Sequence, residues 1–228
     1  MYTAETGPCE SCNLKCDIFL SAREMGLSDK LRPVQSRYRK RQIICSEGEE
    51  ITHVMIILAG NAKMYVEGIN GSNIIISILI PQSYIGHIAV LDYKKYRYSA
   101  AALSDCHICH IGIDAVRKMY RENNSFMDRI NAQITDSISH IMSKLVSLNQ
   151  KQLRGKVAES LLYLSDLSAS DTFRMPVTRR ELAELSAISE ENTVRVLTEF
   201  RNKGIIELSG REISIRNKTM LRSISSVG

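Results

Sequence analysis

The 228-residue sequence lacks the features that carry a chain into or across a membrane. Its first residues, MYTAETG, have neither the basic start nor the apolar core of a secretory signal. Its longest apolar run, IIISILI at residues 74–80, is far shorter than the roughly 20 residues of a membrane-spanning helix. It also has no internal repeat and no low-complexity tract. We therefore expect a cytoplasmic protein with no membrane partner.

The sequence contains six cysteines, and their role bears on the function. In a reducing cytoplasm, six cysteines indicate metal binding, redox chemistry or burial before disulfides. Three of them, Cys9, Cys12 and Cys16, lie close together in PCESCNLKC. The formal net charge of +5 mildly favours a polyanionic partner.

The hydrophobic pattern changes twice along the chain. Residues 38–112 hold short runs rich in Ile and Val, separated by Gly-containing turns, which predicts a small β-barrel or sandwich. Shorter helical segments are expected around residues 28–31 and 114–122. Residues 125–150 then carry apolar residues at spacings of three and four, which predicts one long helix. Its stripe comprises Ile130, Ile134, Ile138, Ile141, Leu145 and Leu148.

Two interpretations of this stripe remain open. The helix packs against its own domain, or it forms the seam of a two-helix dimer, because the repeat approaches heptad spacing without Pro or Gly.

The last part of the chain predicts a winged helix-turn-helix. An amphipathic helix is expected over residues 153–167, followed by a polar loop over 168–176. Thr178 and Glu181 form a capping box, Ser189 offers a second N-cap, and Gly204 ends the second helix. Two short helices joined by about three residues match this motif. The alternation in IIEL and REISI around Ser-Gly predicts a hairpin wing.

One face of the second helix has the chemistry to read DNA. Near its N-terminus it presents Glu191, Val194 and Arg195. Glutamate accepts from cytosine N4, and arginine donates to guanine O6 and N7. Thr178 and Ser189, at the helix starts, belong to the same predicted DNA-binding set. The residues expected to meet phosphates are Arg179, Arg180, Arg201, Lys203 and Arg211.

From residue 42 onward the chain resembles the CRP/FNR family of bacterial transcription regulators. The most specific match is TRRELAELSAISEENTVRVLTEFRNKGII, and the glycines of the first region follow the family's barrel turns. The resemblance aligns Glu191 and Arg195 with the family's base-reading pair. It aligns Val194 with a serine of the FNR branch. Glu190 replaces an arginine of the CRP branch, so the CRP operator is not implied.

The resemblance implies an α+β fold with four parts. These are a cysteine-containing arm (1–24), a cyclic-nucleotide-binding-type β-barrel or jelly roll (25–124), a dimerisation helix (125–150) and a winged helix-turn-helix domain (151–228). It implies a homodimer that binds palindromic operators in double-stranded DNA under an effector's control, with RNA polymerase as a further partner and no enzymatic activity. The alternatives are a redox enzyme that uses the CxxC, and a ligand-binding barrel without regulated DNA binding.

The family's cyclic-nucleotide cassette is degraded here. Gly86 is kept, but His87 stands where the family's glutamate binds the ribose, and Tyr98 separates Arg97 from Ser99. These four residues, Gly86, His87, Arg97 and Ser99, mark the expected effector pocket. Without the carboxylate, cyclic AMP is not the expected effector.

The resemblance also gives the cysteines a role. FNR-type sensors bind an iron–sulfur cluster with three N-terminal cysteines and one on a barrel strand, and the matching set here is Cys9, Cys12, Cys16 and Cys109. Four thiolates suit such a cluster, or zinc as the second choice. Oxygen or nitric oxide would then be the signal. The last gap, three residues, is shorter than in enteric sensors. The remaining alternative is a disordered tail without function or an opportunistic metal site. Cys45 and Cys106 are interpreted as buried small residues.

Overall fold

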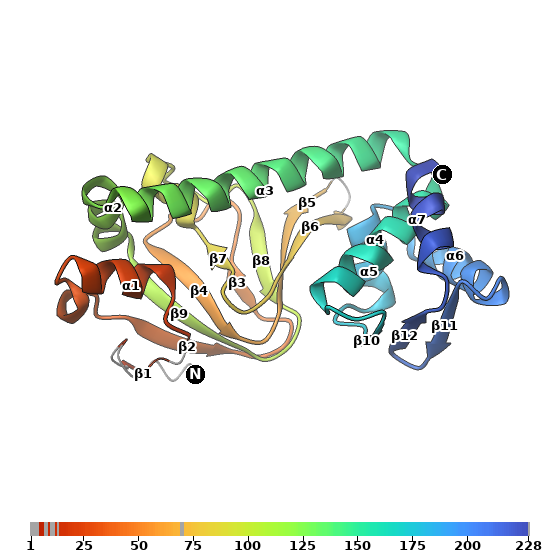
Figure 1. Ribbon diagram of the computed structural model, residues 1–228, viewed down its shortest axis with the longest axis horizontal. Helices are drawn as coiled ribbons and strands as arrows, with labels where there is room; N and C mark the ends of the chain where they lie inside the picture. The colour runs from red at the N-terminus through yellow and green to blue at the C-terminus, as the bar shows by residue number, and fades with distance from the viewer. Residues whose placement is uncertain (1–4, 7–8, 10–11, 13, 69–70, 228) are drawn as a thin grey trace. The chain divides into compact units, whose positions relative to one another are not determined.

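The computed structural model describes residues 5–6, 9, 12, 14–68 and 71–227. The chain forms two compact units, one of Met1–Val66 with Ser77–His140 and one of Glu67–Ile76 with Ile141–Gly228. Helix α3 (Asn124–Gln150) begins in the first unit and ends in the second (Figure 1). In the described part of the chain, no helix is both long and apolar enough to cross a membrane.

The first unit is built on two β-sheets, as the short apolar runs predict. The five-stranded sheet has the order β1-β2-β9-β4-β7 and the four-stranded sheet the order β3-β8-β5-β6. The strands of the first sheet are β1 (Glu5–Thr6), β2 (Val34–Tyr38), β9 (Cys106–Gly112), β4 (His53–Ala59) and β7 (Tyr84–Ile85). Those of the second are β3 (Ile43–Cys45), β8 (Ser99–Ala102), β5 (Ala62–Glu67) and β6 (Asn73–Leu79).

The register of strand β9 decides which side chains reach the outer face of the sheet. Cys109 lies opposite Gln35 of β2 and Ile56 of β4, so these three side chains share one face. Cys106 and His110 point to the other face, as alternation along the strand predicts. The outer face of this sheet therefore carries Cys109 in a central position.

Helix α1 (Asp17–Glu24) covers this outer face and corrects the expectation of an N-terminal arm. Its Ile18, Phe19 and Ala22 are buried in the core of the first unit. Strand β1 also pairs with β2 at the edge of the sheet. Short helices η2 (Ser28–Lys30), η4 (His87–Leu91) and α2 (Ile113–Glu122) complete the unit. The first and last of these fall where the sequence predicts helix.

The two halves of the predicted α3 stripe differ in burial. Ile130 and Ile134 are buried in the core of the first unit, 0% and 8% exposed. Beyond them a set of apolar side chains at helical spacing is 38–59% exposed: Ile138, Ile141, Met142, Leu145 and Val146. Leu148, the last residue of the predicted stripe, is half-buried. The first half of α3 thus packs internally, while the second half presents an uncovered apolar stripe.

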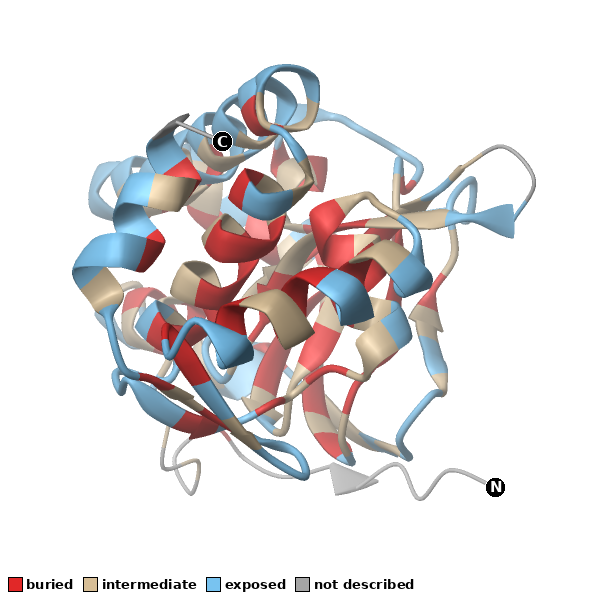
Figure 2. Ribbon diagram, turned by 90° about the vertical axis from the view of Figure 1, so that its right-hand side faces the viewer, coloured by how far each residue is buried: buried red, intermediate tan, exposed pale blue. Residues whose placement is uncertain are grey.

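The second unit combines four helices with a three-stranded sheet. The helices are α4 (Leu153–Leu167), α5 (Arg179–Ser186), α6 (Glu190–Asn202) and α7 (Lys218–Val227). The sheet has the order β10-β12-β11, from β10 (Thr172–Arg174), β12 (Glu212–Ile215) and β11 (Ile206–Ser209). In Figure 2 the helices carry buried residues on one side and exposed residues on the other.

Two local predictions for this unit need correction. Residues 172–174, expected in a polar loop, form strand β10 because β12 supplies backbone hydrogen-bond partners. The wing's two-residue turn is Gly210–Arg211, one position later than the predicted Ser-Gly turn, since Ser209 pairs with Glu212.

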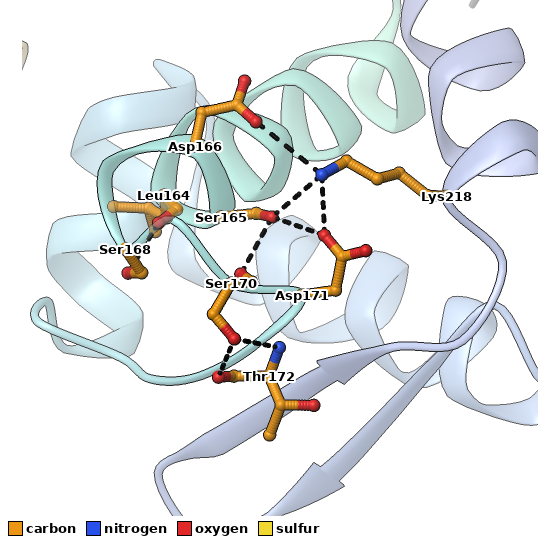
Figure 3. A network of polar contacts seen from close by, with 8 residues as sticks. All are labelled: Leu164, Ser165, Asp166, Ser168, Ser170, Asp171, Thr172 and Lys218. Atoms are coloured by element: carbon orange, nitrogen blue, oxygen red, sulfur yellow. Dashed lines mark hydrogen bonds and ion pairs between the residues drawn. The ribbon is translucent and has the colours of Figure 1, made fainter.

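A polar network holds the frame of this unit together (Figure 3). Nζ of Lys218, at the start of α7, lies 2.6 Å from Oδ1 of Asp171 and 3.7 Å from Oδ1 of Asp166. Ser165 donates from Oγ to Asp171 and to the carbonyl of Ser170, each at 3.0 Å. The end of α4, the start of β10 and the start of α7 are therefore tied at one point.

Candidate nucleic-acid interface and cysteine cavity

Helix α5 begins with the capping box that the sequence predicts. Oγ1 of Thr178 accepts from the Glu181 N–H at 3.2 Å, and the Thr178 N–H donates to Oε2 of Glu181 at 2.8 Å. The helix ends at Ala187, which adopts a left-handed conformation with φ 48°. Lys144 of α3 donates to the carbonyl of Leu185 in the last turn of α5, which satisfies one unpaired helix-end acceptor.

Helix α6 begins at the predicted N-cap. Oγ of Ser189 accepts from the Asn192 N–H at 3.2 Å. The side chains that α5 and α6 bury between them are those expected from the sequence: Leu182, Ala183, Leu185, Val196, Leu197 and Phe200. The pair therefore forms a helix-turn-helix, with its second helix fixed at the N-terminus by its own cap.

The outward face of α6 carries the predicted base-reading residues together. Glu191, Val194 and Arg195 are all exposed, and Val194 keeps 45% of its surface open. Asn192, which no sequence pattern marked, accepts at Oδ1 a hydrogen bond of 2.8 Å from Nη2 of Arg195. The face thus offers an acceptor, an apolar group and an oriented guanidinium within one turn of helix.

The arginines expected to meet phosphates differ in exposure. Arg201 is exposed, and Arg180 is 71% exposed with its Nε 3.4 Å from Oε1 of Glu184. Arg179 is half-buried, and its Nη1 is enclosed without a hydrogen-bond partner among the described residues. Burial also lowers the pKa of Arg179 from its ordinary value. Arg180 and Arg201 are therefore better placed for phosphate than Arg179.

The first unit holds a cavity that brings the four predicted cysteines together. Cys9, Cys12, Cys16 and Cys109 all line it, between helix α1 and the outer face of the five-stranded sheet. A hydrogen bond of 3.1 Å from the Cys12 N–H to the carbonyl of Cys9 closes the CxxC turn. The remaining lining is Lys15, Phe19, Pro33, Gln35, Ile56, Leu58 and Ile111. A set of four sulfur atoms within an apolar wall suits a thiolate-bound metal group.

The cavity is tight in this arrangement. Its volume is about 10 Å³, which is room for about one water molecule. Within the described ranges, no three His, Cys, Asp or Glu side chains are gathered closely enough to hold a single metal ion. The four cysteines thus line a common space that, in this arrangement, is too small for a metal cluster.

Burial governs the acidity of these thiols. It raises the pKa of Cys109 to about 12, with further contributions from Cys9, Cys16 and Cys12. Burial also raises the pKa of Cys16, against the opposing effect of the Phe19 and Ile18 N–H groups at the start of α1. The two other cysteines are buried small residues, as predicted, and Cys106 donates from Sγ to the carbonyl of Asn61 at 3.1 Å.

The four residues of the expected effector pocket differ in burial and in hydrogen bonding. The Gly86 N–H donates to the Tyr98 hydroxyl at 3.0 Å. Ser99 is buried in β8, where its Oγ accepts from the Glu47 N–H at 3.0 Å, whereas Arg97 is exposed. The inserted Tyr98, whose importance the sequence pattern did not reveal, thus accepts the hydrogen bond of the Gly86 amide.

His87 lies beside this glycine and is largely enclosed. Its ring packs edge-on against Tyr84, with centroids 6.0 Å apart. Its Nδ1 has no hydrogen-bond partner in the described part of the chain. Burial lowers the pKa of His87 to about 4, so the ring is neutral at physiological pH.

Each of the two units contains a region that matches a known family model. Residues 35–123 match the family model of the cyclic nucleotide-binding domain, and residues 155–224 match that of the Crp-like helix-turn-helix domain. The anaerobic regulatory protein of Aggregatibacter actinomycetemcomitans is 23% identical over 95% of this chain and 87% of its own. The regulatory protein HlyX of Actinobacillus pleuropneumoniae is 25% identical over 91% and 89%. FixK2 of Bradyrhizobium japonicum has a similar fold, with a TM-score of 0.79 and 21% identity over 86% of this chain and 98% of its own.

Proposed function

This chain belongs to the CRP/FNR family of transcription regulators, and we propose that it binds palindromic operators as a homodimer under the control of its cysteine cavity. The observation that carries the DNA-binding part is the face of α6. Its N-terminal turn presents Glu191, Val194 and Arg195 to solvent, on a helix fixed by Ser189. In this motif, that end of the second helix enters the major groove.

Each of these side chains has a matching group on DNA. Glu191 accepts from the N4 amino group of cytosine, and Arg195 donates to O6 and N7 of guanine. Val194 offers an apolar surface that suits the thymine methyl group. Arg180 and Arg201 flank the face, and their guanidinium groups suit the phosphates of the same half-site.

The exposed stripe of α3 supports the dimer. Ile138, Ile141, Met142, Leu145 and Val146 repeat at three- and four-residue spacing and remain largely uncovered within one chain. A contiguous apolar patch of this kind marks a protein interface. Pairing with the same stripe of a second copy buries it by two-fold symmetry, and it gives the two recognition helices the symmetry of a palindrome.

The shared cavity of Cys9, Cys12, Cys16 and Cys109 supports a thiolate-bound sensor, with an iron–sulfur cluster as the first choice. Such a cluster supplies sensitivity to oxygen or nitric oxide when bound. The chain's own residues contribute the four sulfurs, an apolar wall that excludes water, and the start of α1 with its N–H groups near Cys16. One relative is named an anaerobic regulatory protein, which agrees with such a signal.

A response to cyclic AMP is not part of this proposal. His87 brings no carboxylate for the ribose, the Gly86 amide is bound to Tyr98, and Arg97 is exposed. The polar groups that would hold a cyclic phosphate are therefore dispersed or already bonded.

The test begins with anaerobic purification, an absorption spectrum, and assays for iron, sulfide and zinc. We expect iron and sulfide in the wild type and neither in Cys12→Ser or Cys109→Ser. Selection from random double-stranded DNA then identifies the operator, which we expect to be a palindrome. Zinc without iron would favour a structural metal site, and absence of both metals would refute the sensor. Failure to select any sequence would refute the operator-binding role.

A further inference from the structure

Helix α1 is held to the first half of α3 by polar contacts that begin one residue after Cys16. Nε of Arg129 lies 3.5 Å from Oδ1 of Asp17, and Nε2 of Gln133 donates to Oδ2 of Asp17 at 3.3 Å. Arg129 and Gln133 stand one turn apart on α3, so together they contact both oxygens of one carboxylate. We call this set of three residues the α1–α3 latch.

The Arg129 side chain is fixed from both helices. Its Nη2 donates to Oγ of the fully buried Ser21 at 2.6 Å, and its Nη1 donates to Oγ of Ser125 at 3.0 Å. Its Nε is enclosed and has only the charge of Asp17 nearby, without hydrogen-bond geometry. Loss of Arg129 therefore leaves the buried Ser21 hydroxyl without this donor and leaves the partly enclosed Asp17 carboxylate with only the neutral Gln133 amide of the latch, which is unfavourable.

An apolar layer beneath the latch makes the two helices move together. Ile18 and Phe19 of α1 share one buried core with Phe126, Ile130 and Ile134 of α3. All five side chains are at most 8% exposed. A displacement of α1 is thus transmitted to α3 by close packing as well as by the latch.

The N-terminal end of α1, where Asp17 lies, also faces the cysteine cavity. Cys16 is the N-cap residue of α1 and lines the cavity, as does Phe19 one turn later. Because the cavity has room for about one water molecule, a larger group requires its lining to move, and Cys16 is part of that lining. The residue that moves with Cys16 is Asp17, the acceptor of the latch.

We propose that Arg129 and Gln133 are positioning residues for Cys16. Through their contacts with Asp17, they couple the position of Cys16, and of any group bound in the cavity, to the position of α3. The bound group and the operator rest on the proposed function, whereas the latch is formed by the chain alone. By linkage, a change in α3 on operator binding must act back on Cys16 by the same factor.

The first experiment tests, in the absence of any metal, whether the latch controls the accessibility of Cys16. Metal-free full-length protein is treated with iodoacetamide, and the alkylation rate at each cysteine is followed by mass spectrometry. Arg129→Met should make Cys16 react several-fold faster while Cys106, behind the sheet, reacts at the wild-type rate. The matched control is Arg121→Met, which removes an exposed arginine of α2. Equal Cys16 rates in the wild type and a folded Arg129→Met would overturn the positioning role.

The second experiment measures the coupling. The Cys16 rate is compared with and without saturating operator DNA, for which we expect a change of at least about fivefold in the wild type. In Arg129→Met, the effect of DNA on the Cys16 alkylation rate should shrink below about twofold, although the variant still binds DNA supplied in excess. Gln133→Leu should reduce the same effect less. An undiminished DNA effect in both variants would contradict the coupling.

A third arm adds ferrous iron and sulfide under anaerobic conditions. If the wild type takes up iron, Arg129→Met should take it up with an altered absorption spectrum, and its operator affinity should no longer depend on iron. If the wild type takes up none, the sensor proposal fails, while the alkylation experiments still decide whether the latch positions Cys16.

Discussion

Asn192 and Arg195 are joined by a hydrogen bond of 2.8 Å, one turn apart on the outward face of the recognition helix. The bond orients the guanidinium before DNA arrives, which reduces the side-chain entropy lost on binding. We expect Asn192→Ala to cost about 0.5–1.5 kcal/mol at the base pair read by Arg195, and little elsewhere. Competition between the selected operator and its single-base variants measures this. A uniform loss across all variants would argue against an orienting role.

Arg195 and Arg201 should differ in what their removal does. Arg195→Ala should cost about 1–3 kcal/mol and relax specificity at one base pair of each half-site. Arg201→Ala, if it contacts phosphate, should weaken all sequences alike and reduce the slope of log affinity against log salt by about one. Fluorescence anisotropy at several salt concentrations separates the two. Identical behaviour of both variants would refute the assigned roles.

Glutamate substitutions in the two halves of α3 should have different effects, one on the oligomeric state and the other on folding. Leu145→Glu places a charge in the exposed stripe, where the dimer would bury it beside its own copy. We expect a folded monomer with weakened binding to the palindrome, measured by sedimentation velocity. Ile134→Glu buries a charge inside the first unit instead, and it should unfold that unit.

Ala132→Glu is the control for this pair, since Ala132 is exposed and lies off the stripe. It should remain a folded dimer. A Leu145→Glu protein that stays dimeric would place the interface elsewhere.

The second unit could be predicted in detail because its signals are local. The Thr178–Glu181 capping box and the Ser189 cap act within four residues, so the sequence alone carries them. Strand β10 has no such signal, since TFR contains one buried residue and depends on pairing with β12. The stripe on α3 likewise shows which face is apolar, but not whether the covering partner belongs to the same chain.

Less of the cysteine site could be predicted from local sequence signals. Resemblance to a family pointed to Cys9, Cys12, Cys16 and Cys109, but no local pattern predicted α1. This eight-residue helix has no side-chain N-cap and is stabilised by burying Ile18, Phe19 and Ala22. The Asp17–Arg129 contact joins residues far apart in sequence, so it could be recognised only in the folded chain.

His87 predicts how stability depends on pH. Burial lowers its pKa to about 4 in the folded state, from 6.5 in an unfolded chain. Between these values the unfolded chain binds more protons, so the free energy of unfolding is highest above 6.5 and falls as pH drops toward 4. The loss attributable to His87 is on the order of 3 kcal/mol.

Urea denaturation above pH 6.5 and at several lower values measures this slope. His87→Gln should flatten it. A variant with the wild-type slope would show that other groups, such as His110, whose pKa burial and His53 also lower to about 4, dominate the acid response.

Cyclic AMP should neither bind at physiological concentration nor change operator affinity. The Gly86 amide is bonded to Tyr98, and no carboxylate stands at position 87. Calorimetric titration tests this, with Tyr98→Phe as a second protein in which the amide loses its partner. Micromolar binding to the wild type would contradict the account of this region.

The most direct test of the central claim is operator affinity measured by anisotropy on anaerobically purified protein, before and after exposure to air. We predict that the anaerobic protein is coloured, binds the operator tightly, and loses at least about fivefold in affinity as its colour bleaches. Cys109→Ser should be colourless and insensitive to air, with the weaker affinity throughout. An unchanged affinity in wild-type protein that contains iron, or an air-sensitive affinity in Cys109→Ser, would contradict control of DNA binding by the cysteine cavity.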